Sequence, residues 1–320
     1  MQQQVPPLTE AYALANSGRT DDAIPIIQQH AAFGSGEALF VLGDMYWRGV
    51  GFEQDLAQGR ELFRQASDAG YPMAEKAYTN LLGSGMAGLR DWAGALRRLE
   101  QEARSDGLRA RMLEVVQAMT LDSNGDPVGF PPGERLSDRP EVTLYRGAFS
   151  LSECEFLRLL AEPTYARAGV VISPGDTVRA FVRTADGSTI HWLIEDPATH
   201  ALSRRLAALT ATDVSQAEPL QILRYQPGQE YRPHFDFLED TNRRVLTALV
   251  YLNDDYQGGE TAFPRVGLKV KGRTGDTLVF KSCGPNGNVE PLSEHAGLPV
   301  IRGTKYLASR WIRERPYGLH

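Results

Sequence analysis

A histidine and an aspartate lie one residue apart in the stretch YRPHFDF, residues 231–237. Side chains at positions i and i+2 of a β-strand point to the same side, so His234 and Asp236 project together on a strand. One imidazole and one carboxylate can occupy two adjacent positions around a metal ion, and a third ligand must then come from elsewhere in the chain. A solvent-facing pair on an edge strand explains these two residues equally well.

The other histidines offer few candidates for a third ligand. His30 falls in the helix-rich first part of the chain, His320 is the last residue, and His191 and His200 flank an expected helix. His295 remains, and it opens a strand after a turn-rich loop in the stretch PLSEHAGLPV. Two histidines and one carboxylate form the facial triad of non-haem Fe(II) oxygenases, which leaves open positions for a cosubstrate and dioxygen.

Lys305 follows His295 by ten residues, across the turn LPVIRG. A lysine that points into a β-barrel is costly to bury without a partner. A carboxylate opposite the ammonium group removes that cost, and a dicarboxylate cosubstrate supplies one. The alternative is a surface lysine whose aliphatic stem lies along the protein while its ammonium group stays in water.

Four stretches of the chain resemble, in order, the catalytic domain of the prolyl 4-hydroxylases: LQILRYQPGQEYRPHFDF, RRVLTALVYLNDDYQGGETAFP, GDTLVF and SEHAGLPVIRGTKYLASRWI. The members of this family are 2-oxoglutarate- and Fe(II)-dependent dioxygenases built on a double-stranded β-helix. The resemblance covers about residues 141–315 and is strongest over residues 220–313. The ten-residue spacing from histidine to lysine is part of it.

The resemblance implies roles for individual residues of these stretches. It implies His234, Asp236 and His295 as the iron ligands. It implies Lys305 as the partner of the distal carboxylate of 2-oxoglutarate.

Four further residues match family positions whose roles carry over less directly. Tyr225 and Thr261 are expected to contact 2-oxoglutarate, and Trp311 is expected to line its pocket. Arg244 matches an arginine tied to catalysis. Each residue also has a purely structural alternative. Tyr225 would be an aromatic residue of a sheet and Thr261 a turn residue, while Trp311 would belong to the core and Arg244 to the surface. Arg313 stands where the peptide prolyl hydroxylases carry a histidine, which makes the substrate class less secure.

The activity that the resemblance implies is hydroxylation of a peptidyl residue, with 4-hydroxylation of proline as the leading expectation. Fe(II), 2-oxoglutarate and dioxygen are implied, succinate and carbon dioxide are the co-products, and ascorbate is a further expected requirement. One alternative is a hydroxylase of a free amino acid or a small natural product. Another is a repeat-based binding protein with an inactive barrel, against which the complete set of three ligands and Lys305 argues.

A polar segment, ISPGDTVRAFVRTADGSTIHW, residues 172–192, lies where the family's substrate loop lies. We expect it to be mobile and to help bind the substrate. The alternative is an ordinary surface connection.

The first 120 residues, which precede these stretches, are rich in Ala, Leu, Gly, Glu and Arg, and they repeat with a period near 36 residues. Ala38, Ala74 and Ala110 are spaced by 36, and so are Gly49 and Gly85. This period is typical of stacked two-helix units, in which small residues permit close packing and glycines end helices. A helical bundle with accidental spacing is the alternative.

One of these repeats, residues 37–75, resembles the sel-like class of tetratricopeptide repeats, and a looser copy follows it. Residues 8–36 form a degenerate first unit in this interpretation, with Pro25 interrupting a helix. We expect about six helices. Because such arrays bind protein or pack against a neighbouring domain, the expected partner is a protein or peptide substrate that the repeats recruit.

The predicted fold class is a multidomain α+β chain. It comprises a helical repeat array at residues 1–120, a linker at 121–140 with four prolines, and a catalytic domain at 141–320. From residue 218 onward, short β-rich runs separated by turns predict antiparallel sheets that form a jelly roll, the double-stranded β-helix.

Helices are expected to flank this β-rich region. Ser150 followed by Glu153 predicts a capping box at the start of one helix. Asp196 and Pro197 predict the start of another, which extends to about residue 211.

Charge and cysteine usage exclude several classes of partner. The net charge of −6 makes nucleic acid and anionic membranes poor electrostatic partners. No stretch approaches the roughly 18 apolar residues of a membrane span, and the N-terminus lacks the pattern of a secretory signal. The two cysteines, Cys154 and Cys283, form no disulfide framework, so a cytoplasmic location is expected.

Overall fold

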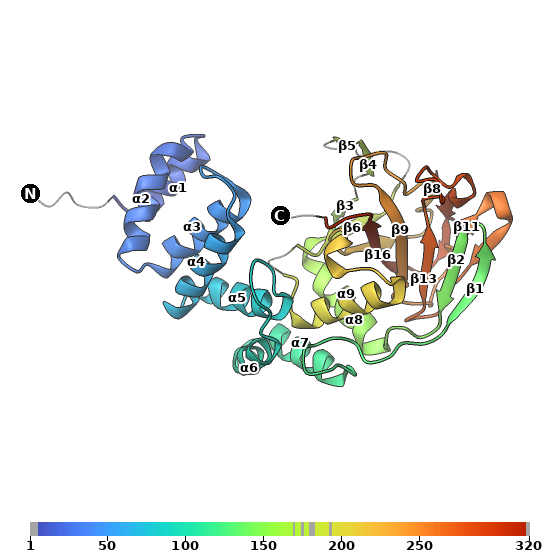
Figure 1. Ribbon diagram of the computed structural model, residues 1–320, viewed down its shortest axis with the longest axis horizontal. Coiled ribbons are helices and arrows are strands. Elements are labelled where there is room, and N and C mark those ends of the chain that lie inside the picture. Colours follow the sequence, from blue (N-terminus) through green and yellow to red (C-terminus); the bar gives the residue numbers. More distant parts are fainter. Residues whose placement is uncertain (1–5, 169, 174–175, 179–182, 192–193, 318–320) are drawn as a thin grey trace, which may run out of the picture. The chain divides into compact units, whose positions relative to one another are not determined.

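The computed structural model describes residues 6–168, 170–173, 176–178, 183–191 and 194–317. The chain divides into two compact units, a helical one up to residue 113 and a sheet-containing one from residue 114, apart from a short segment at 123–125 that groups with the helices. Figure 1 shows both units. Within the described ranges, no helix has both the length and the apolar character that crossing a membrane requires.

Seven helices occupy the described residues up to 118, one more than the approximate number expected. From α1 to α6, each helix after the first packs against the preceding one, as in an array of two-helix repeats. Their bounds are α1 Leu8–Asn16, α2 Thr20–Ala32, α3 Gly36–Arg48, α4 Leu56–Asp68, α5 Pro72–Ser84, α6 Trp92–Glu102 and α7 Gly107–Ala118.

Small residues allow the close helix packing that the repeat pattern predicted. A Cβ atom built on Gly59 in α4 would lie 3.0 Å from the carbonyl oxygen of Gly43 in α3, which confirms a close approach of the two helices. Gly49 and Gly85 cap α3 and α5 in the left-handed conformation, with φ of 67° and 75°. These two glycines therefore end helices, as predicted.

Pro25 does not interrupt a helix, and this expectation was wrong. It lies inside α2, which continues through it from Thr20 to Ala32. An interior proline removes one backbone hydrogen bond. The buried side chains of Ala23, Ile26 and Ile27 hold α2 in place, because most of the stability of a helix in a protein comes from the packing of its apolar face.

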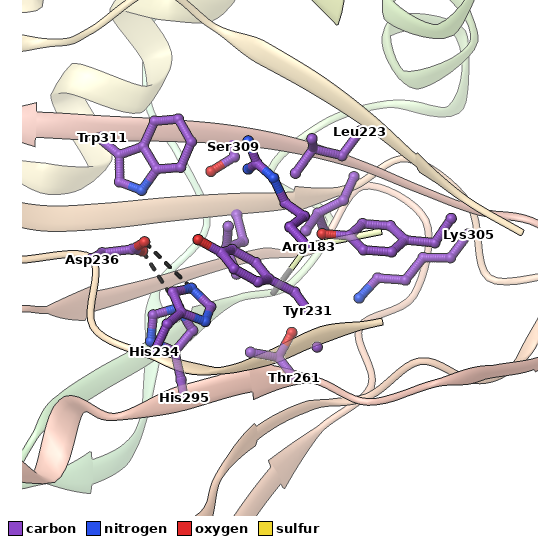
Figure 2. Close-up of a pocket in the computed structure, with 14 residues that line it drawn as sticks. Arg183, Leu223, Tyr231, His234, Asp236, Thr261, His295, Lys305, Ser309 and Trp311 are labelled. Carbon is purple, nitrogen blue, oxygen red and sulfur yellow. Dashed lines mark ion pairs between the residues drawn. The ribbon is translucent and has the colours of Figure 1, made fainter. Parts of the chain in front are cut away.

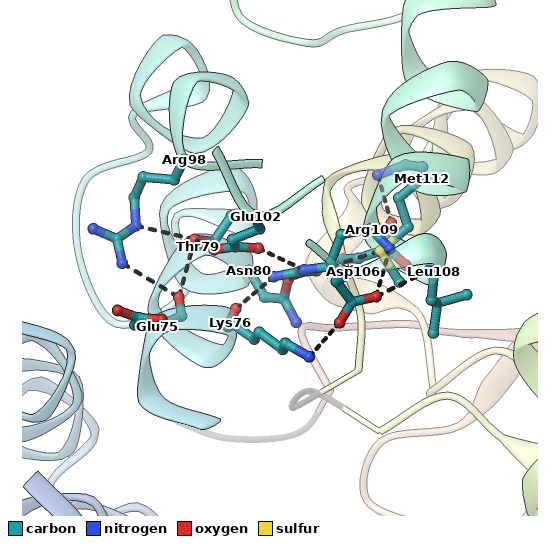
Figure 3. A network of polar contacts seen from close by, with 12 residues as sticks. Glu75, Lys76, Thr79, Asn80, Arg98, Glu102, Asp106, Leu108, Arg109 and Met112 are labelled. Carbon is teal, nitrogen blue, oxygen red and sulfur yellow. Dashed lines mark hydrogen bonds and ion pairs between the residues drawn. The ribbon is translucent and has the colours of Figure 1, made fainter. Parts of the chain in front are cut away.

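A polar network links α5, α6 and α7 (Figure 3). Arg109 of α7 is only 3% exposed, and its guanidinium donates to Glu102 at 2.6 Å, to Asn80 at 3.0 Å and to the carbonyl oxygen of Lys76 at 3.1 Å. Thr79 donates to the second carboxylate oxygen of Glu102 at 2.5 Å. Because a buried charge is tolerated only when it is paired and hydrogen-bonded, this network holds the first turn of α7 against α5 and α6.

Part of the predicted linker at 121–140 is a strand. β1, Gly133–Asp138, pairs antiparallel with β2, Glu141–Tyr145, and so belongs to the sheet-containing unit. Prolines and turn-forming residues lie on both sides of this six-residue strand. The composition of the whole segment therefore resembles that of a linker. The β-region therefore begins before residue 141.

Two antiparallel sheets form the core of the second unit. The larger has the strand order β1-β2-β13-β9-β16-β7-β6-β3, and the smaller has the order β12-β11-β14-β8. Buried apolar residues of both sheets, including Tyr251, Phe263, Phe280 and Leu307, pack together in one cluster. The arrangement is the predicted jelly roll.

The remaining strands and short helices have the following bounds. The larger sheet contains β3 Ala166–Arg167, β6 Asp186–Thr189, β7 Gln221–Tyr225, β9 Arg244–Tyr251, β13 Thr277–Lys281 and β16 Lys305–Arg313. The smaller sheet contains β8 Tyr231–His234, β11 Thr261–Phe263, β12 Leu268–Val270 and β14 His295–Gly297. Two strand pairs are β4 Val170–Ser173 with β5 Asp176–Val178, and β10 Gln257–Gly258 with β15 Val300–Arg302. The 3-10 helices are Glu162–Thr164, Val214–Gln216, Pro264–Val266 and Pro291–Ser293.

Two helices flank the larger sheet, as predicted (Figure 1). α8, Leu151–Ala161, contacts β7, and α9, Pro197–Thr210, contacts β9. The capping box of α8 is present, with Ser150 and Glu153 each accepting from the other's backbone N–H. Asp196 caps α9 by accepting from two backbone N–H groups.

Candidate metal centre

Two strands of the smaller sheet bring the predicted ligands together. β8 ends at His234 and β14 begins at His295, and these two residues are direct partners in the antiparallel register. Asp236 lies two residues beyond the end of β8. The candidate ligand atoms of the three residues all lie within 4.8 Å of one another. An Asp236 oxygen lies 3.5 Å from Nε2 of His234, and the other lies 3.4 Å from Nε2 of His295.

In each of the two histidines, a contact between Nδ1 and a backbone carbonyl oxygen orients the imidazole ring. Nδ1 of His234 lies 2.8 Å from the carbonyl oxygen of Arg232, and Nδ1 of His295 lies 3.0 Å from that of Ser293. An N–H at Nδ1 donates to these carbonyls and leaves the lone pair of Nε2 for a metal ion, which is the usual arrangement of metal-binding histidines. Nε2 of His234 is buried and has no hydrogen-bond partner among the described residues, so it lacks the contact that a metal would provide.

The charges of the site suit a cation. Burial lowers the pKa of His234, and the nearby His295 lowers it further. Burial raises the pKa of Asp236, but the two histidines outweigh that effect and hold this pKa well below its usual value. A neutral imidazole and an ionised carboxylate are the forms that bind metals. Two imidazole nitrogens and one carboxylate oxygen fit the donor set of a non-haem Fe(II) site.

Lys305 lies in the same pocket as the three residues (Figure 2). It is 2% exposed, which excludes the surface alternative, and its Nζ donates to the carbonyl oxygen of Gly259 at 2.7 Å. Burial lowers the pKa of Lys305 to about 8, although the charge of Glu260 raises it. The ammonium group has no carboxylate at hydrogen-bond distance among the described residues.

Tyr225 and Thr261 line the pocket, as their expected roles require. Tyr225 on β7 is the direct partner of Lys305 in the sheet, and burial raises the pKa of its phenol to about 12, so the hydroxyl keeps its proton. Thr261 on β11 accepts a hydrogen bond from the hydroxyl of Tyr251 at 2.9 Å. Both residues are buried.

Trp311 lines the pocket, but Arg244 does not. The guanidinium of Arg244 lies 4.4 Å from the centre of the Trp311 ring. It pairs with both carboxylate oxygens of Glu218, at 2.5 and 2.7 Å. Arg244 is 7% exposed, so it is no surface residue, and it contacts Trp311, which lines the pocket. Arg313 donates to the same carboxylate at 2.5 Å.

Sequence reasoning missed several residues that the structure brings to this pocket. Tyr231 stacks on His234 with ring centres 3.4 Å apart, and the Arg183 guanidinium lies 5.2 Å from the centre of the Tyr231 ring. Thr247 donates to Asp236 at 2.8 Å. Tyr231 begins the stretch that contains the first two ligands, which is a usable signal. Arg183 belongs to the segment 172–192 that is predicted to bind substrate, but the sequence does not mark this residue individually.

The predicted substrate loop, 172–192, is described only in part. β4, β5 and β6 include some of its residues, and β4 pairs with β5. Residues 174–175, 179–182 and 192 lie outside the described residues. Its mobility and its contact with substrate stay predictions.

Comparison of the sequence with known proteins gives a consistent set of similarities. The profile of the 2OG-Fe(II) oxygenase superfamily matches residues 220–313. Prolyl 4-hydroxylase 1 of Arabidopsis thaliana is 32% identical to the chain over 232 residues, which cover 65% of the chain and 82% of that relative.

Two of the solved structures that are similar to parts of this chain are as follows. A viral collagen prolyl hydroxylase from Paramecium Bursaria Chlorella virus-1 superposes with a TM-score of 0.42 and 25% identity, over 54% of this chain and 95% of that chain. A Sel1 repeat protein from Oxalobacter formigenes superposes with a TM-score of 0.31 and 22% identity, over 33% of this chain and 84% of that chain.

Proposed function

Because the chain belongs to the prolyl 4-hydroxylase family of 2-oxoglutarate- and Fe(II)-dependent oxygenases, with helical repeats at its N-terminus, we propose that it hydroxylates a prolyl residue of a polypeptide. One oxygen atom of dioxygen converts the substrate C–H bond to C–OH, and the other enters succinate, which forms with carbon dioxide from 2-oxoglutarate. His234, Asp236 and His295 are the proposed iron ligands, and Lys305 is the proposed anchor of 2-oxoglutarate.

One observation carries this proposal. Three side chains that are up to 61 residues apart in the sequence, from His234 to His295, have their ligand atoms within 4.8 Å of one another. A buried lysine without a carboxylate partner at hydrogen-bond distance, among the described residues, lines the same pocket. A metal ion and a dicarboxylate together satisfy both features, and neither a structural histidine pair nor a surface lysine does.

Each residue has a distinct task in the proposed reaction. The bound iron would supply the oxidative decarboxylation of 2-oxoglutarate and the transfer of one oxygen atom to the substrate. Lys305 would hold the distal carboxylate through a charge-assisted hydrogen bond, which is strong because the pocket excludes water. Tyr225 and Thr261 would hold the same molecule with neutral hydroxyl groups. Thr247 would keep Asp236 in the orientation that binds metal.

An assay with defined substrates tests the proposal. The purified chain is supplied with Fe(II), 2-oxoglutarate and ascorbate and is offered proline-rich peptides or free amino acids, and the products are analysed by mass spectrometry. We expect one added oxygen atom on a prolyl residue of a peptide, together with an equal amount of succinate. Ascorbate, which would keep the iron reduced, is expected to increase the number of turnovers.

The other outcomes identify the alternatives. Oxygen added only to a free amino acid would replace the peptide hydroxylase with a small-molecule hydroxylase. Absence of succinate under every condition, in a protein that binds iron, would favour a repeat-based binding protein. The helical repeats are proposed to recruit the polypeptide substrate, and the cytoplasmic location stays a prediction from the cysteine usage.

A further inference from the structure

Trp311 carries a buried polar group that no described residue satisfies. Its side chain lines the pocket of the proposed metal centre and is 9% exposed. The indole Nε1 has no hydrogen-bond partner among the described residues. An indole N–H can only donate, and a buried donor that stays unpaired is costly. The pocket therefore lacks an acceptor that a bound molecule would bring.

The indole nitrogen faces the reacting end of the pocket. In Figure 2 the nitrogen-bearing edge of Trp311 is turned toward the side that holds Asp236 and the hydroxyl group of Tyr231. Lys305 lies at the opposite end of the pocket in the same view. Trp311 and Lys305 are six residues apart on β16, which corresponds to roughly 20 Å along a strand.

The distance between Trp311 and Lys305 along β16 indicates which bound molecule contacts the indole group. The proposed cosubstrate would extend from Lys305 to the metal ligands. Trp311 is on the other side of the pocket, where its sheet partner is Thr247, the residue that orients Asp236. The position beside Trp311 is therefore left for the molecule that is oxidised.

A buried ion-pair cluster holds the ring of Trp311 in place. Glu218 pairs with Arg244, which stacks on the ring at 4.4 Å, and also with Arg313. Arg313 further donates to the carbonyl oxygen of Asn242 at 2.6 Å, in the loop that follows Asp236. Glu218, Arg244 and Arg313 are each 5–7% exposed. Arg313 also pairs with Asp240 at 3.3 Å. The carboxylate of Glu218 thus links both guanidinium groups in the interior, where a buried charge must stay paired.

We propose that the indole N–H of Trp311 binds the substrate by donating a hydrogen bond to a backbone carbonyl oxygen of the prolyl segment, and that Arg313 is a positioning residue for this contact through Glu218 and Arg244. The proposal rests on the proposed function. A prolyl residue has a backbone carbonyl but no backbone N–H. A fixed neutral donor is therefore a suitable group for recognising it, and a carbonyl oxygen satisfies the indole.

The substitution Trp311→Phe tests the hydrogen bond, because it keeps an aromatic ring and removes the N–H. We expect the KM for a prolyl peptide to rise about tenfold. The KM for 2-oxoglutarate and the affinity for Fe(II) should stay at the wild-type values. A rise in the KM for 2-oxoglutarate with an unchanged peptide KM would assign the indole to the cosubstrate and overturn the proposal, as would no change in either constant.

Arg313 supplies an independent test in case Trp311→Phe does not fold. Arg313→Gln leaves the indole intact but removes one partner of Glu218, and we expect the peptide KM to rise while the KM for 2-oxoglutarate does not. Arg313→Lys should restore part of the affinity, because it keeps the positive charge. A loss of thermal stability with an unchanged peptide KM would show that Arg313 is only structural.

Two controls separate the possible failures. Arg243→Gln removes an arginine that pairs with Glu314 at the surface, and it should leave both constants unchanged. The wild-type chain is measured first with the same peptide. If it does not hydroxylate the peptide, the proposed function is wrong, whereas hydroxylation with no effect of Trp311→Phe contradicts only the inference about Trp311.

Discussion

At the scale of single residues, the orientation of one carboxylate decides how well the proposed site holds its metal. Thr247 donates to Asp236 at 2.8 Å and is fully buried. Residues that orient a metal ligand in this way typically contribute 10–100-fold to metal affinity. We expect Thr247→Val to weaken Fe(II) binding by about that factor, measured by titration of the metal-free protein, without loss of the fold.

A second buried threonine supplies the matched control. Thr277 on β13 is also fully buried, and its hydroxyl has no hydrogen-bond partner among the described residues. Thr277→Val removes a hydroxyl of the same kind at a position away from the proposed ligands. It should leave Fe(II) affinity unchanged, and equal losses in the two variants would mean that Thr247 acts only through the core.

The charge of Lys305 makes cosubstrate binding depend on pH. Its pKa is lowered to about 8, mainly by burial. The charged form is the one that binds a carboxylate, so binding is at its full strength only well below pH 8. It weakens as the pH rises through 8, because the ammonium group loses its proton. We expect kcat/KM for 2-oxoglutarate, which reports the free enzyme, to fall by up to about tenfold per pH unit above 8.

The pH dependence has its own control. Lys305→Met removes the titrating group, so this variant should have a high KM for 2-oxoglutarate at every pH and should lose the decline above pH 8. A decline that persists in Lys305→Met would belong to another group, and Lys305 would then not be the anchor.

At the scale of elements, the residue that follows β10 contacts the proposed cosubstrate anchor. Gly259 directly follows β10, and its carbonyl oxygen accepts from Lys305 at 2.7 Å. Gly259 has φ of +67°, and a Cβ atom built on it would lie 3.2 Å from Cδ of Lys305. We expect Gly259→Ala to raise the KM for 2-oxoglutarate by displacing Lys305, in addition to the backbone cost of about 1–2 kcal/mol for an L-residue in this region.

Gly267 separates these two effects. It has the same φ of +67°, but no atom lies within 4 Å of a Cβ atom built on it. Gly267→Ala should therefore lower the thermal midpoint without changing the KM for 2-oxoglutarate. If both alanine variants raise this KM equally, the contact between Gly259 and Lys305 is not what positions the lysine.

The alternation of strand residues explains why the pocket could be predicted from the sequence. Lys305, Leu307, Ser309 and Trp311 all line the pocket, two residues apart on β16. Local spacing thus indicates which side chains share a face. Likewise, the spacing of His234 and Asp236 is local, and both residues line the same pocket.

Contacts between distant segments could not be predicted in the same way. Glu218 meets Arg313 across 95 residues, and nothing near either residue in the sequence marks their pairing. β1 is short and lies between prolines, so its composition resembles that of a linker, and only its pairing with β2 makes it a strand. The helical conformation at Pro25 likewise depends on packing. The buried face of α2 contributes more to stability than the one backbone hydrogen bond that the proline removes.

At the scale of the whole molecule, the two units have separate tasks in the proposed function. The sheet-containing unit holds all the proposed ligands and the cosubstrate anchor, and the helical unit holds none of them. A binding module linked to a catalytic module raises the effective concentration of a substrate that both can reach. A long polypeptide can benefit from this effect, and a peptide with a single prolyl motif cannot.

The exposed apolar side chains of the helical unit are the residues with which to test recruitment. Phe33, Met73 and Leu89 are 76%, 55% and 90% exposed. Replacing each by serine should change folding stability by no more than about 0.5 kcal/mol, because such positions lack buried contacts. If the array recruits the substrate through any of them, the KM for a long proline-rich polypeptide should rise about fivefold or more, while the KM for the short peptide stays the same.

Ile301→Ser, at a residue of the sheet-containing unit that is 73% exposed, is the control and should change neither constant. Equal KM values for the long and the short substrate in the wild type would instead mean that the array does not contribute to binding.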